Sequence, residues 1–409
     1  MRLLFLSSIF PHGTARVTGT FNLELCRALA AEHDVRIVAP REFLNVWRSR
    51  HESVAADHWV SETRGLTVSY PTYFYTPGFA GSWYGESMWL SVRRHLRRVV
   101  EEFEPEAVVS YWAHPDGEVA LRIAQPLSIP AVVIIGGSDV LILPQDRRRR
   151  PKIQRVLQES SAVMTVSEGL RRAVIDLGTE PSRVHTIYQG VDDELFFPGD
   201  TTAARQRLSL PIDRRLLLWV GRMVDFKGLD TLIAAFDLVC QRQPDLHLLL
   251  VGDGPLRTAV QEDVRRRGLN DHVTFVGSQP PAQLSDWYRA SNLFVLSSWS
   301  EGLPNVLREA VSCGRPFVST DVGSVREIAD SPGGPLFAEL VPIGDALAMA
   351  VAIERVLHPD YLAAVQSVPH RSWRDTAHDL IELLRRLRGE STGEPNTGQV
   401  ENVPHEITV

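Results

Sequence analysis

The chain has 409 residues, 44% of them hydrophobic and 23% charged, which is typical of a globular protein too long for one ordinary core. Its formal net charge of -7 gives no bulk electrostatic support for binding nucleic acid. The three cysteines, Cys26, Cys240 and Cys313, are odd in number and form no Cys-x-x-Cys pair. They predict small buried thiols in a reducing compartment, not disulfides or a metal site.

The N-terminal run "MRLLFLSS" is too short for the hydrophobic region of a signal peptide, and no small-residue cleavage site follows it. No apolar run approaches the ~20 residues that a membrane-spanning helix needs. We therefore expect a cytoplasmic protein, and leave open a peripheral contact with the inner face of a membrane.

Short apolar runs alternate with helical patterns along the first half of the chain. Helical periodicity is present over 19–31, 86–102 and 168–177. The predicted strands lie at 2–8, 34–40, 106–111, 130–135, 162–167 and 183–188.

The second half repeats this alternation, with a helix predicted over 229–239 from apolar residues at three- and four-residue steps. Continuous apolar strands separated by helices are typical of parallel sheets covered on both faces. The predicted fold class is therefore α/β, with two doubly wound Rossmann-like domains facing each other across a cleft. The predicted strands of this half lie at 216–221, 246–251, 273–277, 293–298 and 315–320.

The turn-rich stretch "GVDDELFFPGD" predicts a domain boundary near residue 195. This gives an N-terminal domain of residues 1–195 and a C-terminal domain of residues 196–370. A last helix within 371–388 is expected to cross back to the N-terminal domain. The tail 389–409 has almost no large apolar residues and is predicted to be disordered.

Ligands of doubly wound sheets bind beyond the carboxyl ends of the strands, so we expect the chemistry in the loops that follow strands. Gly221, Arg222 and Lys227 follow one strand, and a guanidinium and an ammonium on one loop suit a diphosphate. Two solvated loop cations are the alternative. Gly252 and Gly254 follow the next strand and would let a ligand approach the backbone, or form a plain turn.

The stretch "EGLPNVLRE" (301–309) places two glutamates around a predicted helix N-terminus, whose amides can hold phosphate oxygens. Phosphate would repel a carboxylate, whereas two carboxylate oxygens suit vicinal hydroxyl groups. One glutamate is then expected on a ribose and the other on a second sugar; the alternative is a helix-dipole and turn role. The residues expected to bind the donor are Glu301, Gly302, Leu303, Asn305, Val306 and Glu309.

Together these loops predict a site for a nucleoside diphospho-sugar, with UDP- or GDP-sugars favoured. The sequence has no Asp-x-Asp motif and no His, Cys or carboxylate cluster with metal-ligand spacing. We therefore expect no metal and no cofactor, because the two cations and the helix N-terminus can neutralise the leaving diphosphate.

Several motifs in register resemble those of family 4 retaining glycosyltransferases, which have the GT-B architecture: "GRMVDFKG", "VGDGPLR", "VTFVGSQ", "LSSWSEGLPNVLREAVSCGRPFVSTDVGSVREI" and "RSWRDTAHDLIELL". The resemblance covers residues 1 to about 388 and is dense from 216 to 330. It implies transfer of a sugar to an acceptor hydroxyl with retention of configuration and without a metal. It also implies that Arg222 and Lys227 hold the diphosphate, Glu309 the ribose, and Glu301 the donor sugar.

By the same resemblance, the N-terminal half binds the acceptor, and Gly19 and Thr20 approach the diphosphate at a helix N-terminus; a plain helix start is the alternative for these two residues. His114 and Asp116 follow one strand, and Ser138 and Asp139 follow the next, so these four are expected on the acceptor side.

This subgroup usually has a histidine just before Gly-Ser-Asp, where this chain has Gly136. His114 is the candidate to replace it as a catalytic residue, and a structural histidine is the alternative. In "YQGVD" this chain has Gln189 where the family prefers asparagine.

The predicted mechanism needs no side-chain nucleophile. Cleavage passes through an oxocarbenium-like state, and a phosphate oxygen can take the acceptor's proton if attack occurs on the face that the diphosphate leaves. A double displacement stays an alternative.

Two segments of the acceptor domain bear on its surroundings. Residues 70–89 concentrate aromatic side chains, and 145–152 form a basic run, "QDRRRRPK". Such segments dock on anionic lipid, or else form a core loop and a solvated charge run. In the first case the acceptor is lipid-linked, as in cell-surface polysaccharide or glycolipid assembly; a free polysaccharide or small-molecule hydroxyl acceptor is the other option.

Rival functions within the fold are a sugar-nucleotide epimerase and a phosphorylase. A non-catalytic subunit that binds a nucleotide sugar is a rival of another class, and Gly136 is the feature that favours it. A dinucleotide oxidoreductase is disfavoured, because no Gly-x-Gly-x-x-Gly follows the first strand.

Overall fold

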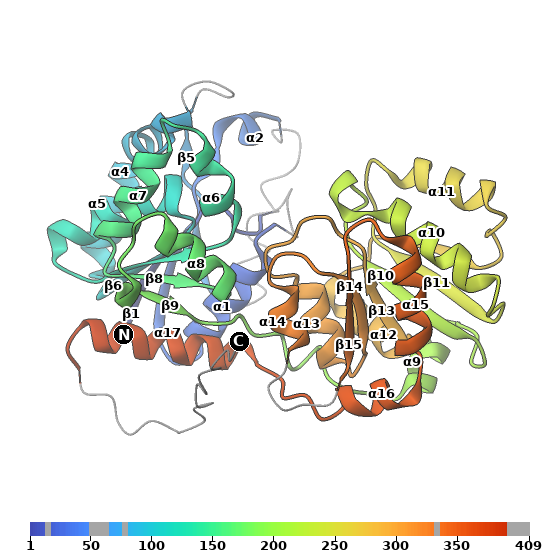
Figure 1. Ribbon diagram of the computed structural model, residues 1–409. Helices are drawn as coiled ribbons and strands as arrows, with labels where there is room; N and C mark the ends of the chain where they lie inside the picture. The colour runs from blue at the N-terminus through green and yellow to red at the C-terminus, as the bar shows by residue number, and fades with distance from the viewer. Residues whose placement is uncertain (13–17, 49–64, 76–80, 331–335, 391–409) are drawn as a thin grey trace, which may run out of the picture.

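The computed structural model describes residues 1–12, 18–48, 65–75, 81–330 and 336–390. Two α/β domains lie side by side (Figure 1). All but the first two residues of the predicted disordered tail, 389–409, lie outside the described residues, as do parts of the aromatic segment 70–89 and of the loop before Gly19.

The N-terminal domain is built on a seven-stranded parallel sheet of order β4-β2-β1-β6-β7-β8-β9. A two-stranded parallel pair, β3 and β5, lies outside it. The strands are β1 (Arg2–Leu6), β2 (Asp34–Val38), β3 (Arg41–Glu42), β4 (Thr67–Ser69), β5 (Thr72–Tyr73), β6 (Ala107–Tyr111), β7 (Ala131–Ile135), β8 (Ala162–Thr165) and β9 (Val184–Thr186). The helices are α1 (Thr20–Ala30), α2 (Phe43–Arg48), α4 (Tyr84–Phe103), α5 (Glu118–Leu127), α6 (Ser138–Leu141), α7 (Arg150–Glu159) and α8 (Glu168–Asp176). Shorter turns are η1 (Gly81–Trp83), η2 (Ala113–Gly117), η3 (Leu143–Gln145) and η4 (Pro181–Arg183).

The C-terminal domain is built on a six-stranded parallel sheet of order β12-β11-β10-β13-β14-β15. The strands are β10 (Arg215–Val220), β11 (Leu246–Val251), β12 (Val273–Gly277), β13 (Leu293–Leu296), β14 (Phe317–Thr320) and β15 (Ala338–Val341). The helices are α9 (Thr201–Arg207), η5 (Asp225–Lys227), α10 (Leu229–Cys240), α11 (Arg257–Arg266), α12 (Pro281–Ala290), α13 (Asn305–Ser312), α14 (Val325–Ala329), α15 (Ala346–Val356) and α16 (Pro359–Val365). The final helix of the described chain is α17 (Trp373–Leu387).

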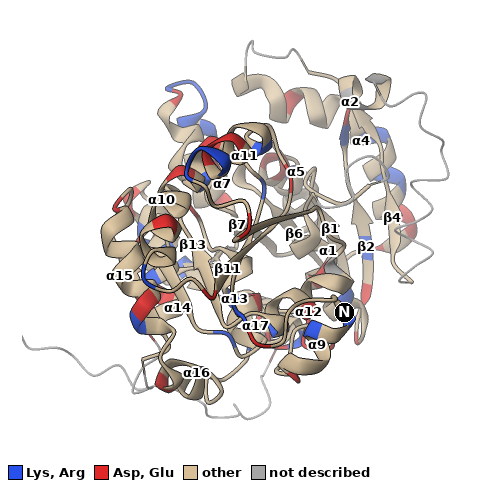
Figure 2. Cartoon of the chain, turned by 90° about the vertical axis from the view of Figure 1, so that its right-hand side faces the viewer, with Lys and Arg blue, Asp and Glu red and all other residues tan. Residues whose placement is uncertain are grey.

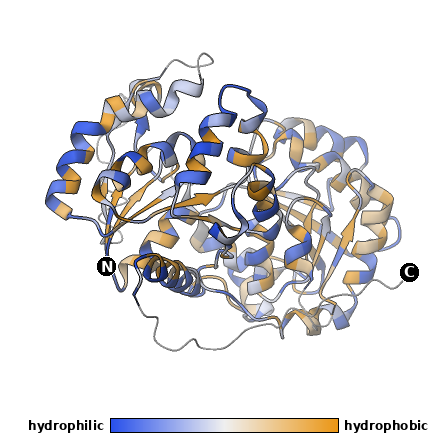
Figure 3. Cartoon of the chain, turned by 60° about the vertical axis from the view of Figure 1, so that its left-hand side comes forward, coloured by the Kyte–Doolittle hydropathy of each residue, from blue (hydrophilic) through white to orange (hydrophobic). Residues whose placement is uncertain are grey.

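The strands are hydrophobic along their length, and the helices turn their apolar faces toward them (Figure 3). Charged residues lie mainly on helices and loops, and the central strands are almost free of them (Figure 2). Strands buried on both faces cannot alternate polar and apolar residues, which is why continuous apolar runs identified them. The predicted fold class is confirmed.

Four described strands were not predicted: β3, β4, β5 and β15. Three of them have only two or three residues, and the fourth, "AELV", carries a glutamate, so none forms a continuous apolar run. All lie at sheet edges or outside the main sheets, where burial on both faces is not required.

Two segments cross between the domains and run beside each other. Val191 and Ser372 form a parallel bridge, with hydrogen bonds from Val191 N–H to the Arg371 carbonyl (2.9 Å) and from Trp373 N–H to the Val191 carbonyl (3.2 Å). Helix α17 then packs on α1 and contributes apolar side chains to the core of the N-terminal domain. In Figure 1 it lies beneath that domain, although the preceding helices belong to the C-terminal one.

A carboxylate provides a second link between the domains. Glu327 of α14 accepts hydrogen bonds from the backbone N–H groups of Glu168 (2.8 Å) and Gly169 (2.9 Å), at the start of α8 in the other domain. It also accepts one from the Tyr188 hydroxyl (3.1 Å). A carboxylate at a helix N-terminus is favourable, so this contact ties the two domains together.

We predict that Gly190→Ala lowers stability, because the added Cβ would lie 1.9 Å from the carbonyl carbon of Ser372. Relief requires the two crossing segments to separate, and such overpacking costs about 1–3 kcal/mol. Urea unfolding measures the loss. The control is Gly169→Ala, whose methyl group would meet no atom closer than 3.5 Å. Equal stability of the two variants would contradict the tight contact of the crossing segments.

Candidate functional site

The loops that follow β10 and β13 are fastened to each other in the C-terminal domain. The Ser297 hydroxyl donates to the Lys227 carbonyl (2.8 Å), and the Trp299 N–H donates to the Phe226 carbonyl (2.7 Å). Gly228 has a φ of +59° between them, and a Cβ there would lie 2.1 Å from the Ser297 carbonyl oxygen. Only glycine fits both the conformation and the space.

This fastening brings Lys227 and Glu301 together. Lys227 Nζ lies 2.6 Å from Glu301 Oε1, and the side chains are only 16% and 12% exposed. The Ser298 hydroxyl donates to the same oxygen (2.6 Å). An ammonium has three donors and a carboxylate two acceptor oxygens, so Lys227 retains donors for a phosphate and Glu301 retains Oε2 for a hydroxyl.

Arg222 lies on the same loop with its side chain exposed. Among the residues described, its guanidinium has no hydrogen bond or ion pair. Gly221 joins it to the end of β10, where its N–H donates to the Val251 carbonyl (3.0 Å). The loop thus presents one free cation and one paired cation at the carboxyl end of the sheet.

Glu309 lies in the second turn of α13 and accepts a hydrogen bond from the Tyr288 hydroxyl of α12 (2.8 Å). Burial raises its pKa, while the Tyr288 hydrogen bond and the charge of Arg308 oppose the rise. Arg308 itself donates to the Asn305 side chain (3.2 Å) and to the Gly190 carbonyl of the domain crossing. Glu309 is therefore a positioned, half-buried acceptor and not a free helix-terminal charge.

The glycines after β11 serve close packing between loops. A Cβ at Gly252, where φ is +131°, would lie 1.8 Å from the Gly221 carbonyl oxygen. One at Gly254 would lie 2.4 Å from the Met223 carbonyl oxygen. These glycines set the shape of the loop that carries Arg222, and a direct approach of ligand to them stays a prediction.

The segment that follows Glu301 also contacts the N-terminal domain. Leu303 packs against the core of the N-terminal domain, and Val306 packs into the core of its own domain. A Cβ at Gly302 would lie 3.5 Å from the Gly136 carbonyl oxygen, beyond the end of β7. The loop predicted to hold the donor sugar therefore touches the loop in which the expected histidine is replaced.

Gly19 and Thr20 begin α1 after the end of β1. Gly19 has a φ of +71°, and a Cβ there would lie 2.4 Å from the Ile9 carbonyl oxygen. Its own carbonyl accepts from Asn22 N–H (3.0 Å), so it caps the helix. Thr20 is half-buried, and its predicted approach to a diphosphate stays a prediction.

His114 lies in the interior of the N-terminal domain, with a side chain that is 0% exposed. Its Nε2 is 3.4 Å from Glu118 Oε2. Burial acts to raise the pKa of Glu118, but contacts with His114, Lys152 and Arg122 lower it overall. A side chain closed to solvent gives no support to the predicted replacement of the missing histidine, which stays a prediction.

Asp116 and Asp139 are buried and hold strand ends. Asp116 accepts from Ser8 N–H (2.5 Å) and from the Ser8 hydroxyl (2.9 Å), and joins the ends of β1 and β6. Asp139 accepts from Gly137 N–H (2.8 Å) and Ala113 N–H (3.2 Å), and joins the ends of β6 and β7. Burial raises the pKa of Asp116 to about 7 and that of Asp139 to about 6.

Of the predicted acceptor-side residues, Ser138 is half-buried at the start of α6, while His114, Asp116 and Asp139 are closed to solvent. The three buried side chains shape the edge of the sheet. The predicted donor-side residues Arg222, Lys227 and Glu301 do gather at one edge of the C-terminal sheet.

Sequence comparison with known proteins follows the same division of the chain. The model described as Glycosyltransferase Family 4 matches residues 18–195, and the one described as Glycosyl transferases group 1 matches residues 214–359. D-inositol 3-phosphate glycosyltransferase of Frankia alni is 33% identical over 301 residues, 67% of this chain and 72% of the relative. The chain belongs to glycosyltransferase family 4.

Two further comparisons agree with this assignment. Over 402 residues, 94% of each chain, the glycosyltransferase is 28% identical to the putative teichuronic acid biosynthesis glycosyltransferase TuaC of Bacillus subtilis. The crystal structure of Anabaena HepE in complex with UDP superposes with a TM-score of 0.72 at 18% identity, over 94% of this chain and 100% of that one. At this identity the likeness shows the fold alone, which is GT-B. The predictions of family and enzyme class are confirmed.

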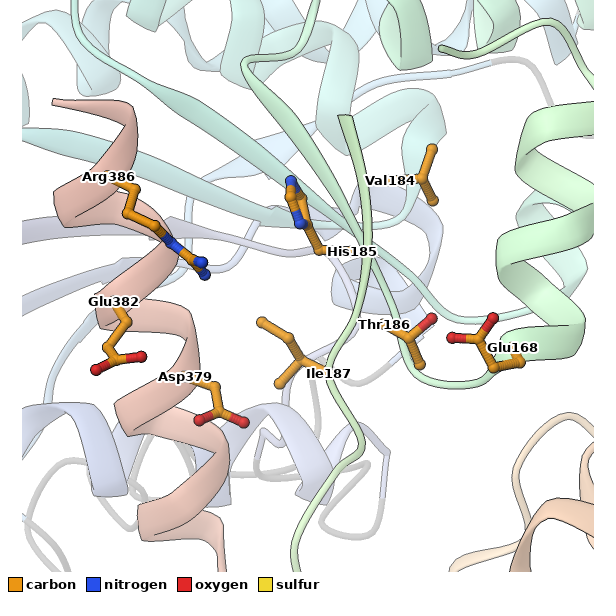
Figure 4. A pocket seen from close by; sticks show the side chains of 8 residues that line it. All are labelled: Glu168, Val184, His185, Thr186, Ile187, Asp379, Glu382 and Arg386. Carbon is orange, nitrogen blue, oxygen red and sulfur yellow. The ribbon is translucent and has the colours of Figure 1, made fainter. Parts of the chain in front are cut away.

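Two hollows lie in the described part of the glycosyltransferase, and the second borders the Glu301 loop through Gly323, where a Cβ would lie 2.0 Å from the Glu301 carbonyl oxygen. One, of about 350 Å³, lies between β9 and α17 and is lined mainly by charged and polar side chains, including His185, Asp379 and Arg386 (Figure 4). The other, of about 660 Å³, lies between α8 and α14 and is lined from both domains. We assign neither to the chemistry; the second lies beside the contact that Glu327 makes between the domains.

No three His, Cys, Asp or Glu side chains gather as metal ligands in the part of the chain that the structure describes. Within the same residues, no helix combines the length and apolar character that crossing a bilayer requires.

The side chains that hold the two glutamates of the glycosyltransferase were not predicted from the sequence. Ser298 follows β13 directly and Tyr288 lies on the preceding helix, α12. The position of Ser298, at the carboxyl end of a strand, could have marked it. Tyr288 carries no such signal, because its contact with Glu309 depends on how α12 packs against α13.

We predict that Asp116 makes the glycosyltransferase less stable as pH rises from about 4 to about 7. The folded carboxyl, with a pKa of about 7, keeps a proton that the unfolded chain releases near its ordinary pKa of about 4. In Asp116→Asn this contribution is lost, so the stability difference between variant and wild type changes by up to ~1.4 kcal/mol per pH unit.

Urea unfolding between pH 5 and 8 measures this difference. The exposed Asp193→Asn is the control and should follow the wild-type profile. Parallel profiles for wild type and Asp116→Asn would contradict the raised pKa.

Proposed function

We propose that the protein transfers a glycosyl group from a nucleoside diphospho-sugar to an acceptor hydroxyl, with retention of anomeric configuration and without a metal. The observation that carries the proposal is the Lys227–Glu301 pair (2.6 Å) beside the exposed Arg222. The two cations suit a diphosphate, and the carboxylate suits sugar hydroxyls. Glu309, half-buried on α13 and held by Tyr288, suits the ribose.

In this proposal the bond between the anomeric carbon and the diphosphate oxygen breaks, and a bond forms to the acceptor oxygen on the same face. The acceptor's proton passes to the leaving diphosphate, so nucleoside diphosphate is the second product. Lys227 and Arg222 stabilise its negative charge, which is the part a metal would otherwise play.

Retention by this route is supported by the hydrogen bonds and the ion pair that three carboxylates of the two domains already make. Glu301 already binds Lys227 and Ser298 through Oε1, and Asp116 and Asp139 bind strand-end N–H groups in the interior. These contacts favour holding roles over nucleophilic attack by any of the three.

We also propose that the N-terminal domain docks on anionic lipid and takes an acceptor in cell-surface polysaccharide or glycolipid assembly. Trp83 is 63% exposed, with Lys152 Nζ 5.9 Å above its ring, and Ile142 is 59% exposed. Arg149 lies 4.7 Å over the Tyr84 ring, so the basic run packs against the start of α4. Exposed aromatic and basic side chains in one region suit the headgroup layer. The name of TuaC, a teichuronic acid biosynthesis enzyme, is consistent with this class of acceptor.

We expect Lys227→Ala and Glu309→Gln each to weaken binding of UDP or GDP and their sugars, by about tenfold for a lost charge-assisted hydrogen bond. Thermal shifts with UDP, GDP, ADP and their sugars identify the nucleotide, and calorimetric titration in EDTA then gives affinities. The exposed Arg374→Ala, on α17, is the control. Unchanged affinity in both site variants would contradict the donor site, and a shift abolished by EDTA would contradict metal independence.

Flotation with vesicles tests the docking surface. The triple variant Arg147→Ser/Arg148→Ser/Arg150→Ser should reduce partition onto phosphatidylglycerol vesicles by about a hundredfold, at about 1 kcal/mol per cationic side chain. Neither protein should bind pure phosphatidylcholine strongly. The control is Arg265→Ser/Arg266→Ser/Arg267→Ser on the other domain, which removes the same charge. Equal loss in both triple variants would contradict a localised surface.

A further inference from the structure

Tyr111 is the last residue of β6, near the centre of the N-terminal sheet. Its ring is packed against Phe21 of α1, with centroids 4.8 Å apart. The next residue, Trp112, donates its N–H to the Ile134 carbonyl of β7 (2.9 Å). Strand, neighbour and helix therefore fix the direction in which the Tyr111 hydroxyl points.

That hydroxyl fills the space of the side chain that position 136 lacks. A Cβ at Gly136 would lie 2.3 Å from Tyr111 Oη and 2.7 Å from Cζ. On its other side, the Gly136 carbonyl oxygen is 3.5 Å from where a Cβ of Gly302 would lie. Gly136 is thus a thin spacer between the Tyr111 hydroxyl and the loop that carries Glu301.

The hydroxyl is without a partner in the described part of the chain, and the residue is 6% exposed. Its oxygen is not among the fully buried unpaired side-chain atoms of the described residues, so it stays open to a ligand. The contrast within the chain is clear: the hydroxyls of Tyr188, Tyr288 and Tyr361 all donate to carboxylates. An unpaired hydroxyl beside a proposed sugar site is accounted for if a ligand completes its hydrogen bonding.

The groups around Tyr111 keep this hydroxyl protonated. Burial raises its pKa far above the ordinary range, and the Asp139 carboxylate raises it further. Phe21 and Gly136, which also lie against Tyr111, carry no charge. The group is therefore a neutral O–H that can both donate to and accept from a sugar hydroxyl.

We propose that the Tyr111 hydroxyl binds a hydroxyl group of the transferred sugar, and supplies from β6 the polar contact that Gly136 cannot supply from β7. This inference rests on the proposed function, since it names a further residue of the same donor site. It also explains why position 136 is a glycine, because any larger residue there would displace the Tyr111 ring.

Tyr111→Phe tests the proposal, because it removes the hydroxyl and keeps the ring against Phe21. The probes are a nucleoside diphosphate and its sugar conjugate, chosen as the UDP or GDP pair that stabilises the wild type most. By calorimetry, the affinity for the diphosphate should stay within about twofold, while that for the nucleotide sugar should fall about tenfold. Tyr361→Phe, which removes a hydrogen-bonded hydroxyl of α16, should change neither affinity.

Gly136→Ala provides a second variant, since its methyl group must push the Tyr111 ring aside. It should also weaken the nucleotide sugar selectively. Wild-type affinity for the nucleotide sugar in Tyr111→Phe would overturn the inference, as would an equal loss for both ligands, which marks a structural role. If the wild type binds no nucleotide, the proposed function fails and takes this inference with it, which is a distinct outcome.

Discussion

The close contact of the two chain crossings at Gly190 and Ser372 is the constraint on which the architecture depends. In each parallel sheet the loops that follow the strands all lie at the carboxyl edge. A site built from both domains therefore needs these two edges to face each other. A single crossing segment would let the domains rotate freely about it. Two crossing segments, bridged at Val191 and Ser372 and in close contact at Gly190, restrict the domains to rotation about one axis. Helix α17 then anchors the return segment in the core of the N-terminal domain, and Glu327 fastens the domains at the start of α8 and at Tyr188, three residues before Val191.

This axis is coupled to the donor site through one short helix. Arg308 of α13 binds the Gly190 carbonyl, while Glu309, the next residue, is held by Tyr288, and Leu303 of the preceding loop packs on the other domain. A rotation of the domains would therefore move a loop that also carries Glu301. Because Glu301 is paired with Lys227, the charges proposed to hold the donor are positioned by the same packing that sets the domain angle.

Most of the fold was predictable because strands buried on both faces must be continuously apolar, as in "LLLWV" of β10 and "AVVII" of β7. The edge strands β4 and β15 were not predicted, because a strand at the edge of a sheet is less completely buried and can carry polar residues. The site was predictable where residues lie in the loop that follows a strand, as Arg222 and Lys227 do after β10. The surroundings of His114 were not, because sequence places it in a loop after β6 but does not say that the side chain turns inward to Glu118. Nor could sequence show that Tyr111 and Gly136 share one space, since they are neighbours only through the register of β6 and β7.

The buried carboxylates of the N-terminal domain show what this arrangement requires. Asp116 and Asp139 carry raised pKa values because water is excluded, so at neutral pH each is an unfavourable place for charge. Yet each accepts hydrogen bonds from backbone N–H groups just beyond the ends of strands. Asp116 accepts from Ser8, and Asp139 accepts from Gly137 and Ala113. The strand ends so fixed are those of β1, β6 and β7, which carry Tyr111 and Gly136 to the edge that meets the Glu301 loop. A stability cost in the interior of one domain is thus coupled to rigidity at its contact with the other, which is what the proposed mechanism requires, since it relies on positioning and not on a nucleophile.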